Sequence, residues 1–214
     1  MAPRTGEHGK RLERLWAGEF GDEYVDRNAA AGALREGWWS DLLRRLEPAS
    51  ALEVGCNIGA NLQWVAPILG PEAVVGIDIN EKALAKLRRR IPGVRAVHAR
   101  ALELPFPDRA FGLTFTMGVL IHQSPEDLPA VMAEVVRCAD RFVLCVEYHA
   151  DGEEEVPYRG ERGALYRRDY GGLYTELHPE LRLLEQGFLP APEGGRRTAF
   201  DDATYWLFER PSAG

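Results

Sequence analysis

Hydrophobic and polar positions along this chain follow a pattern of short apolar strands separated by amphipathic helices. Stretches of strand length that are rich in apolar residues occur at residues 51–55, 73–78, 94–99, 111–117 and 142–147. Helical spacing of apolar residues occurs at 34–46, 61–69, 81–90 and 128–136. Strands that are apolar throughout are typical of a parallel sheet covered by helices on both faces. The pattern therefore predicts an α/β fold with a mostly parallel sheet.

The ends of the chain depart from this alternation. The first 50 residues are predicted to be helical, and residues 183–189 and 204–209 are predicted to form a terminal antiparallel pair of strands. Residues 149–172 are polar and rich in glycine, which predicts a loop or insertion. We expect one domain in four parts, comprising a helical segment 1–47, a sheet core 48–147, an insertion 148–180 and a strand pair 181–214.

Two helix starts carry capping residues. Asn80 is predicted to cap the helix over 81–90. Either Ser124 or Asp127 could cap the helix that follows the fourth apolar run, and Pro129 leaves the choice open.

Composition narrows the class of protein. The 214 residues are 45% hydrophobic and 28% charged, which is ordinary for a globular protein, and the net charge of −7 argues against a nucleic-acid-binding surface. The sequence shows neither a signal peptide nor an apolar run long enough to span a membrane. The three cysteines form no C-x-x-C pair, so we expect no disulfide framework and no metal site. The cytoplasm is the expected compartment.

The first apolar run ends in the motif Glu53-Val54-Gly55-Cys56-Asn57-Ile58-Gly59-Ala60-Asn61. The glycines allow a tight turn and a close approach of the backbone to a ligand. Asp78 ends the next strand, where a carboxylate can accept hydrogen bonds from both hydroxyls of a ribose. These features predict an adenosine-bearing ligand. The predicted contacts from this region are Glu53, Gly55, Cys56, Asn57, Gly59, Asn61, Asp78, Ile79, Asn80 and, from the fourth strand, Met117.

The residues missing from the motif decide which ligand is expected. A dinucleotide fingerprint needs glycine where Asn57 and Ala60 stand, and no Gly-Lys-Ser/Thr of a phosphate-binding loop is present. The E-x-G-x-x-x-G form resembles the first motif of class I methyltransferases that use S-adenosylmethionine. The resemblance implies a Rossmann-like fold and S-adenosylmethionine as cofactor. An NAD- or nucleotide-sugar-binding oxidoreductase and a non-catalytic adenosyl-ligand-binding protein remain the alternatives.

The resemblance continues through residues 104–111 (LPFPDRAF) and 118–122 (GVLIH). Arg100 and Gly112 depart from it, since members of the family often carry acidic residues at those positions. The resemblance then implies that the backbone at Ala101 and Leu102 holds the adenine.

More narrowly, the chain resembles methyltransferases associated with pseudaminic acid biosynthesis. The resemblance rests on residues 16–28 (WAGEFGDEYVDRN), the motif at 53–61, 118–122, 145–148 (CVEY), 158–160, 168–170 and 201–209 (DDATYWLFE). It implies that residues 1–47 form a lid in which Tyr24 and Arg27 hold the carboxylate of the cofactor.

His122 and Glu147 end up at the rim where the acceptor would react, just past the fourth and fifth strands. His122 is the leading candidate for the general base because the imidazole of a histidine titrates near neutrality. The alternative is that His122 only caps the turn. Glu147 is the competing base, or else a carboxylate that orients the backbone or an arginine. The tyrosines and arginines of 148–174 predict a polar, anionic small molecule such as an acidic sugar, methylated on O or N. The predicted substrate contacts are Tyr148, His149, Tyr158, Arg159 and Arg168.

Overall fold

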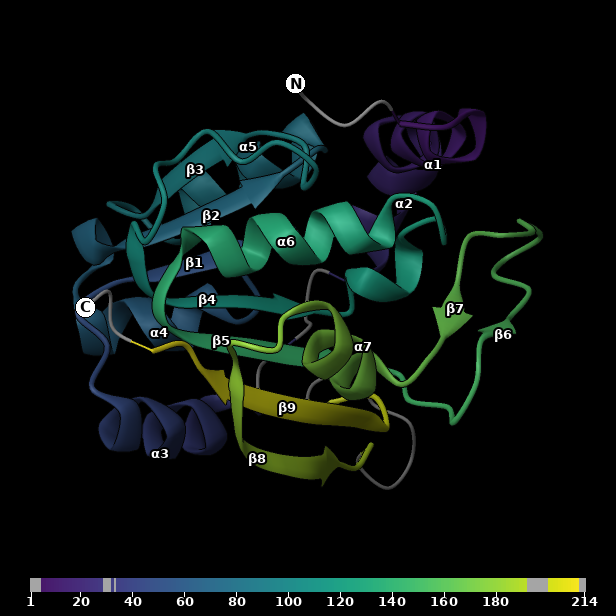
Figure 1. Cartoon of the computed structure of the whole chain (residues 1–214). Coiled ribbons are helices and arrows are strands. Elements are labelled where there is room, and N and C mark those ends of the chain that lie inside the picture. Colours follow the sequence, from purple (N-terminus) through teal and green to yellow (C-terminus); the bar gives the residue numbers. More distant parts are fainter. Residues whose placement is uncertain (1–4, 29–31, 33, 192–199, 212–214) are drawn as a thin grey trace.

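A seven-stranded sheet runs through the computed structural model, which describes residues 5–28, 32, 34–191 and 200–211 (Figure 1). In chain order its strands are β1 (Ala51–Val54), β2 (Val74–Asp78), β3 (Arg95–His98), β4 (Phe111–Met117), β5 (Ala139–Glu147), β8 (Arg182–Leu189) and β9 (Ala203–Glu209). Their spatial order is β3-β2-β1-β4-β5-β9-β8. The first five strands are parallel, and β9 is antiparallel to both β5 and β8. The predicted mostly parallel sheet with a terminal antiparallel pair is confirmed.

Helices cover both faces of this sheet. They are α1 (Glu7–Ala17), α2 (Glu19–Arg27), α3 (Glu36–Leu46), α4 (Leu62–Leu69), α5 (Glu81–Arg90), α6 (Leu128–Cys138) and α7 (Tyr170–Leu177), with short 3₁₀ turns η1 (Pro71–Ala73) and η2 (Leu120–His122). Buried side chains of α3, α4 and α5 form one hydrophobic cluster with the sheet, and those of α6 form another on the opposite face together with α7. The strand order reverses between β1 and β4, and ligands of such sheets bind beyond the carboxyl ends of the strands at that point.

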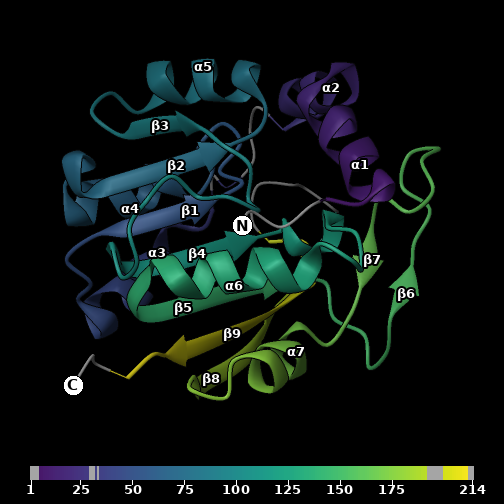
Figure 2. The same cartoon turned by 45° about the horizontal axis from the view of Figure 1, so that its top comes forward.

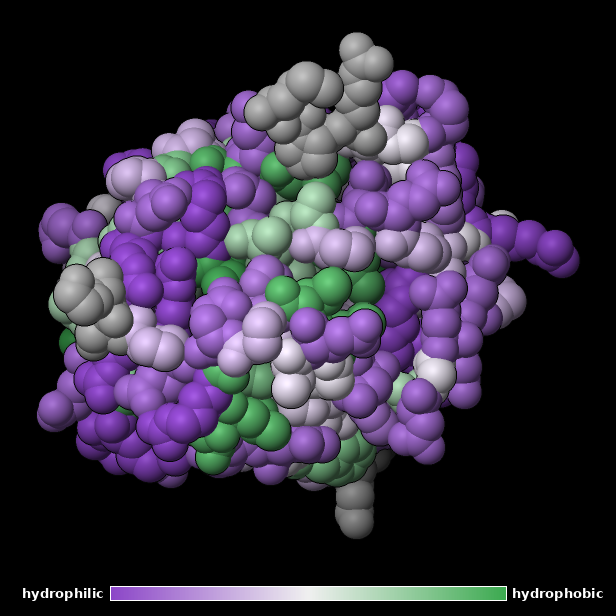
Figure 3. Space-filling model, viewed as in Figure 1, coloured by the Kyte–Doolittle hydropathy of each residue, from purple (hydrophilic) through white to green (hydrophobic). Residues whose placement is uncertain are grey.

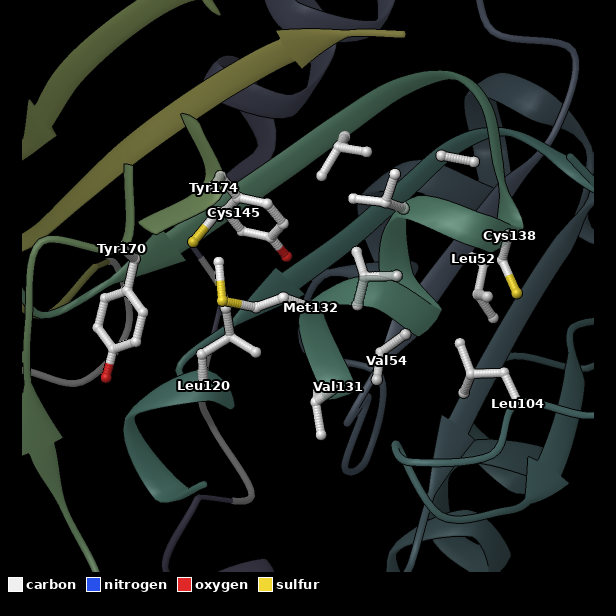
Figure 4. Packing of buried hydrophobic residues seen from close by; sticks show 14 of the residues in the cluster. Leu52, Val54, Leu104, Leu120, Val131, Met132, Cys138, Cys145, Tyr170 and Tyr174 are labelled. Atoms are coloured by element: carbon white, nitrogen blue, oxygen red, sulfur yellow. The ribbon is translucent and has the colours of Figure 1, made fainter. Parts of the chain in front are cut away.

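The cluster under α6 shows how tightly the sheet is covered. In Figure 4, Met132 of α6 lies close to Leu120 and Cys145, and Val131 and Val54 lie nearby. Met132 and Cys145 are fully buried. This packing fixes the carboxyl ends of β4 and β5 relative to each other, and those ends carry His122 and Glu147.

The two helices for which capping residues were predicted begin in different ways. The Asn80 side chain accepts a hydrogen bond from the Ala83 N–H at 2.9 Å, as predicted for the start of α5. Asp127 occupies the N-cap position of α6 without capping it, while the Ser124 hydroxyl accepts the Asp127 N–H at 3.1 Å. Pro129 then falls in the first turn of α6, where its missing N–H costs no helical hydrogen bond.

The insertion after β5 contains more structure than its polarity predicts. Two short antiparallel strands, β6 (Glu154–Glu155) and β7 (Tyr166–Arg167), form a hairpin beside α1 (Figure 2). The helix α7 then begins at Tyr170, where the Asp169 side chain accepts the Gly172 N–H. Tyr170 and Tyr174 are fully buried, so they pack as a helical stripe, while Tyr166 lies in β7. The strands were missed because strands of two polar residues carry no hydrophobic alternation.

Hydrophilic side chains cover most of the face seen in Figure 3, with the hydrophobic ones in small groups between them. Within the described residues, no helix has the length and apolar character needed to cross a membrane.

Candidate active site

A cavity lies at the carboxyl ends of β1, β2, β4 and β5, beneath α1 and α2. It is the place where the strand order predicts a ligand. Most residues predicted from the sequence line it, namely Tyr24, Glu53, Gly55, Cys56, Asn57, Asn61, Asp78, Ile79, Asn80, Ala101, Leu102, Met117, His122, Glu147, Tyr148 and Tyr158. Five predicted residues are not among those that line it, namely Arg27, Gly59, His149, Arg159 and Arg168.

Asp78 ties the ends of the first two strands together. One carboxylate oxygen accepts the Asn57 N–H at 2.8 Å, and the other accepts the Asn80 N–H at 2.8 Å. Burial raises the pKa of Asp78, and the backbone donors of Asn80 and Asn57 oppose that rise. Each oxygen can accept further hydrogen bonds, so this carboxylate can hold a diol at the cavity wall.

Glu53 and Asn57 give the neighbouring stretch of the cavity two unsatisfied acceptors. The Asn61 amide donates to Glu53 Oε1 at 2.6 Å, but Glu53 Oε2 and Asn57 Oδ1 are buried and have no hydrogen-bond partner within the described residues. Burial raises the pKa of Glu53 to about 8, against the lowering effect of Asn61 and of the Arg35 charge, so Glu53 becomes an ionised acceptor when a further positive charge lies beside it. Buried acceptors without donors are costly, so this region suits a ligand that brings several N–H donors, such as an ammonium group.

Arg35, which the sequence analysis did not single out, supplies the positive charge of this region. Its guanidinium donates to Asn61 Oδ1 at 2.7 Å and contacts Met117 Sδ at 3.1 Å. It also lies 5.0 Å from the ring centre of Phe200. Its spacing offered a signal, because Arg35 and Trp39 are one helical turn apart and both face Asn61.

Arg27, the arginine predicted for this role, belongs to a different environment. It forms an ion pair with Glu23 of the same helix at 3.0 Å and lies 5.9 Å from the ring centre of Phe20. Its neighbour Tyr24 does line the cavity. Residues three apart on a helix differ in direction. The turn of α2 that points Tyr24 into the cavity therefore leaves Arg27 outside the cavity lining.

The two motif glycines have different structural reasons. A Cβ on Gly55 would lie 2.4 Å from Val119 Cγ2, so the turn after β4 packs directly on the glycine. A Cβ on Gly59 would lie 2.5 Å from Leu87 of α5, away from the cavity lining. Both have positive φ, which other residues adopt only with strain. Gly59 is thus required by helix packing.

Arg100, the departure from the family pattern, is used for attaching α1. Its guanidinium donates to Glu13 at 2.6 Å and also to the hydroxyl of Thr5. The residues after it, Ala101 and Leu102, line the cavity as predicted for an adenine contact.

His122 faces the cavity with one ring nitrogen already engaged. Its Nδ1 lies 2.6 Å from the Ala164 carbonyl oxygen, and only a protonated Nδ1 can donate to that oxygen. The neutral ring therefore carries its lone pair on Nε2. Burial lowers the pKa of His122 to about 4, against the effect of the Ala164 carbonyl. The near-neutral ionisation expected from residue type is wrong for this reason, and the imidazole is neutral at physiological pH.

Glu147 is committed to the backbone of the turn after β4. Its two oxygens accept the N–H groups of Val119, Leu120 and Ile121 at 3.0 to 3.4 Å. Burial raises its pKa to about 7, and the same N–H groups oppose that rise. The arrangement matches the alternative role considered for Glu147, a carboxylate that orients the backbone beside His122.

Two aromatic residues from distant segments pack against His122. Trp16 of α1 lies 4.3 Å from it and Tyr158 of the insertion lies 5.4 Å from it, measured between ring centres. We call Trp16, His122 and Tyr158 the aromatic wall. Tyr148 extends the same side of the cavity, and its hydroxyl donates to Asp201 at 3.3 Å. Trp16 and Asp201 each begin a segment that carries the resemblance, but nothing in their spacing indicated that they would line the cavity.

The remaining predicted substrate contacts are engaged elsewhere. Arg168 is buried, donates to Glu153 at 2.8 Å and lies 4.2 Å from the Tyr166 ring centre. Arg159 and His149 are exposed at the surface. Tertiary contacts therefore turn three of the predicted basic and imidazole groups away from the cavity lining.

The turn at 161–164 joins α1 to His122. Arg11 of α1 forms an ion pair with Glu161 at 3.0 Å and donates to the Arg162 carbonyl. The His8 ring contacts the Gly163 carbonyl oxygen at 2.9 Å. The next residue, Ala164, orients His122. One short turn thus holds α1 over the cavity and selects the tautomer of His122.

Comparison with known proteins agrees with this geometry. A family model described as a methyltransferase domain matches residues 51–141. The chain is 37% identical over 68 residues to a fatty-acid O-methyltransferase of Mycolicibacterium smegmatis, covering 31% of this chain and 25% of that protein. It is 32% identical over 121 residues to a demethylmenaquinone methyltransferase of Geobacillus stearothermophilus, covering 51% of each chain. The chain thus spans a quarter to a half of the length of these relatives.

Solved structures share the whole fold at low sequence identity. The 1,6-didemethyltoxoflavin-N1-methyltransferase of Burkholderia thailandensis, solved with its substrate and S-adenosylhomocysteine, has a TM-score of 0.71 at 19% identity, covering 100% of this chain and 93% of that one. The magnesium protoporphyrin IX methyltransferase of Synechocystis PCC 6803, solved with S-adenosylmethionine, has a TM-score of 0.67 at 12% identity, covering 98% and 100%. Residues 51–141 of this chain therefore match a methyltransferase-domain model, and the chain shares the fold of these two solved methyltransferases.

Proposed function

We propose that this protein transfers a methyl group from S-adenosylmethionine to an O or N atom of a small molecule. The observation that carries the proposal is the order of polar groups along the cavity. Asp78 can accept both ribose hydroxyls, while Glu53 Oε2 and Asn57 Oδ1 can accept the ammonium of a methionine moiety. Arg35, close to both Glu53 and Asn61, is suited to the carboxylate.

Glu53, Asn57 and Arg35 together match an amino acid in its doubly charged form. This pairing replaces the predicted contact of Arg27 with the carboxylate by one with Arg35, and it keeps Tyr24 in the lining. The backbone at Ala101 and Leu102 remains the proposed contact for the adenine, together with Ile79 and Asn80.

The bound cofactor supplies a methyl group on a positively charged sulfur, and the chain must align the acceptor with it and take away one proton. We assign the proton to Nε2 of His122, since Nδ1 is held by Ala164. The acceptor's own proton would become strongly acidic as the acceptor atom is methylated and the sulfur leaves as a neutral thioether. A base with a pKa of about 4 is then sufficient. Glu147 positions this base by fixing the turn that carries it.

An acidic sugar as acceptor stays a prediction of the sequence, and the geometry lends it little support. Its case depended on arginines of the insertion, of which Arg159 is exposed and Arg168 is paired with Glu153. A grouping with the pseudaminic acid-associated methyltransferases likewise stays a prediction. The relatives named above act on a fatty acid and on demethylmenaquinone by their names, so they leave the acceptor of this chain open.

Two experiments test the proposal. Titration calorimetry with S-adenosylhomocysteine and with NAD should give binding of the first only, and Asp78→Ala should weaken that binding by about 1–3 kcal/mol because a charged hydrogen-bond acceptor is lost. Asp41→Ala, which removes a surface ion pair of α3, is the matched control. Binding of NAD instead would favour the oxidoreductase.

A labelled methyl donor with a pool of small metabolites should then give a labelled product. Cofactor binding with no product from any pool would favour the non-catalytic alternative.

A further inference from the structure

The acceptor end of the cavity can be located relative to the cofactor groups. Asp78, Glu53 and Asn57 lie at the ends of β1 and β2, whereas the aromatic wall follows β4 and is completed by α1 and the insertion. His122 belongs to the wall and is the proposed base. The molecule that loses its proton to His122 must therefore lie against this wall.

The three rings of the wall touch one another. The Trp16 and Tyr158 ring centres are 6.3 Å apart with planes inclined by 31°, and His122 lies 4.3 Å from Trp16. A ligand ring between two stacked rings needs about 7 Å, so there is no room for one between Trp16 and Tyr158. The ligand instead lies on the surface that the rings share. A flat ring covers such a surface more completely than a puckered one.

Trp16 adds one polar requirement. Its indole Nε1 is buried and has no acceptor in the part of the chain that the structure describes. A ligand atom that accepts a hydrogen bond would satisfy this donor, because an unpaired buried N–H is costly.

The charges around the wall disfavour an anion. Of the described residues that line the cavity, six are acids and a single one is an arginine, Arg35; the acids are Glu13, Glu53, Asp78, Asp127, Glu147 and Asp201. Arg35 donates to Asn61 beside Glu53, at the cofactor end. Of these acids, Glu13 forms an ion pair with Arg100, and the Arg35 charge lies close enough to Glu53 and Asp201 to interact with both. The guanidinium of Arg159 lies 6.0 Å from the Tyr158 ring centre, but Arg159 is exposed and is not among the residues that line the cavity. A carboxylate ligand inside the cavity would therefore meet mainly acidic side chains.

We propose that the methyl acceptor is a flat, uncharged ring compound that packs on Trp16, His122 and Tyr158 and carries the hydroxyl or N–H that is methylated. The proposal rests on the proposed methyltransferase function for the placement of the acceptor beside His122. It makes Trp16 and Tyr158 specificity-determining residues.

Matched probes test the shape and the charge separately. Ligand-observed NMR on the full chain with S-adenosylhomocysteine measures binding of 2-naphthol, of decahydro-2-naphthol and of N-acetylneuraminate. The first two share a hydroxyl and a ring size but differ in flatness, and the third is an acidic sugar. We expect 2-naphthol to bind about three- to tenfold more tightly than its saturated counterpart, the range for an aromatic contact, and N-acetylneuraminate not to bind.

Variants of the aromatic wall test whether it causes the preference for 2-naphthol over decahydro-2-naphthol. Trp16→Leu should remove the preference for 2-naphthol while Trp16→Phe keeps most of it, and Tyr158→Leu gives a second reading if a Trp16 variant does not fold. Phe188→Leu is the control, since this ring is exposed on β8. Equal affinity for the flat and saturated probes, absence of binding by the flat probe, or tighter binding of N-acetylneuraminate overturns the proposal.

Failure of the proposed function has a different signature. If the chain does not bind S-adenosylhomocysteine in calorimetry, the methyltransferase proposal fails whatever the probes do. If it binds S-adenosylhomocysteine but prefers the sugar acid, only the acceptor class is wrong.

Discussion

The cofactor end and the acceptor end of the cavity are built in contrasting ways. The cofactor end draws Glu53, Asn57 and Asp78 from two adjacent strands and the loop between β1 and α4, and backbone hydrogen bonds hold Asp78 in place. The acceptor end joins Trp16, His122 and Tyr158 from three segments that only the folded chain brings together. A local motif can therefore specify the cofactor, whereas the acceptor depends on how the lid and the insertion dock.

The largest expected effect is on turnover, and it should leave cofactor binding unchanged. His122→Ala should lower turnover by roughly 10²–10⁴-fold, the usual range for loss of a general base. Affinity for S-adenosylhomocysteine should change little, because the ring faces the acceptor end. His149→Ala is the matched control, since His149 is exposed and outside the cavity lining. A turnover within a few-fold of wild type would leave His122 with a structural role only.

The ionisation of His122 should appear in the stability of the protein. The imidazole protonates at about 6.5 in the unfolded chain and at about 4 when folded, so the unfolded state binds more protons between these values. The contribution of neutral His122 to the free energy of unfolding is therefore complete above pH 6.5. As the pH falls towards 4, the free energy of unfolding decreases by at most about 3 kcal/mol. Urea unfolding of wild type and His122→Gln between pH 4 and 7 measures the difference, which also cancels the opposite contributions of Glu53 and Glu147. The same pH dependence in both proteins would contradict burial as the cause.

Alanine variants of Arg35 and Arg27 test which of the two arginines contacts the cofactor. Arg35→Ala should weaken binding of S-adenosylhomocysteine by about 1.5–3 kcal/mol, the range for a hydrogen bond to a charged group, and Arg27→Ala should have almost no effect. Binding of 5′-methylthioadenosine, which has no amino acid moiety, should be unchanged in both variants and controls for folding. An equal loss for both ligands would mean that Arg35 supports only the structure.

The smallest expected effect tests the docking of the lid. Arg11→Ala and Glu161→Ala should each lower turnover by no more than about fivefold, because the ion pair is partly exposed and such pairs contribute up to about 1 kcal/mol. The double variant Arg11→Glu with Glu161→Arg should recover part of the loss. Arg44→Ala in the Arg44–Asp41 pair of α3 is the control. No loss in either single variant would show that α1 docks without this ion pair.

The fold followed from hydrophobic periodicity because the mostly buried strands β1, β2, β4 and β5 leave a strong signal. β4 spans the residues predicted for it, and β2 and α4 begin within one residue of the prediction. β5 starts earlier than expected, at Ala139, since its first residues are polar at the edge of the pairing with β4. The hairpin of β6 and β7 left no such signal, because its residues are held by contacts with α1 and η2.

The sequence by itself determined the parallel sheet, the turn at Gly55 and the acid at Asp78, because these depend on neighbours along one strand–loop–helix unit. Only the tertiary structure decided that Arg35 rather than Arg27 reaches the cavity and that Glu147 holds a turn. It also decided that burial keeps the His122 imidazole neutral, with its lone pair on Nε2. The direction and burial of these side chains and the tautomer of His122 depend on contacts between distant segments. The spacing of residues along a single segment does not predict such contacts.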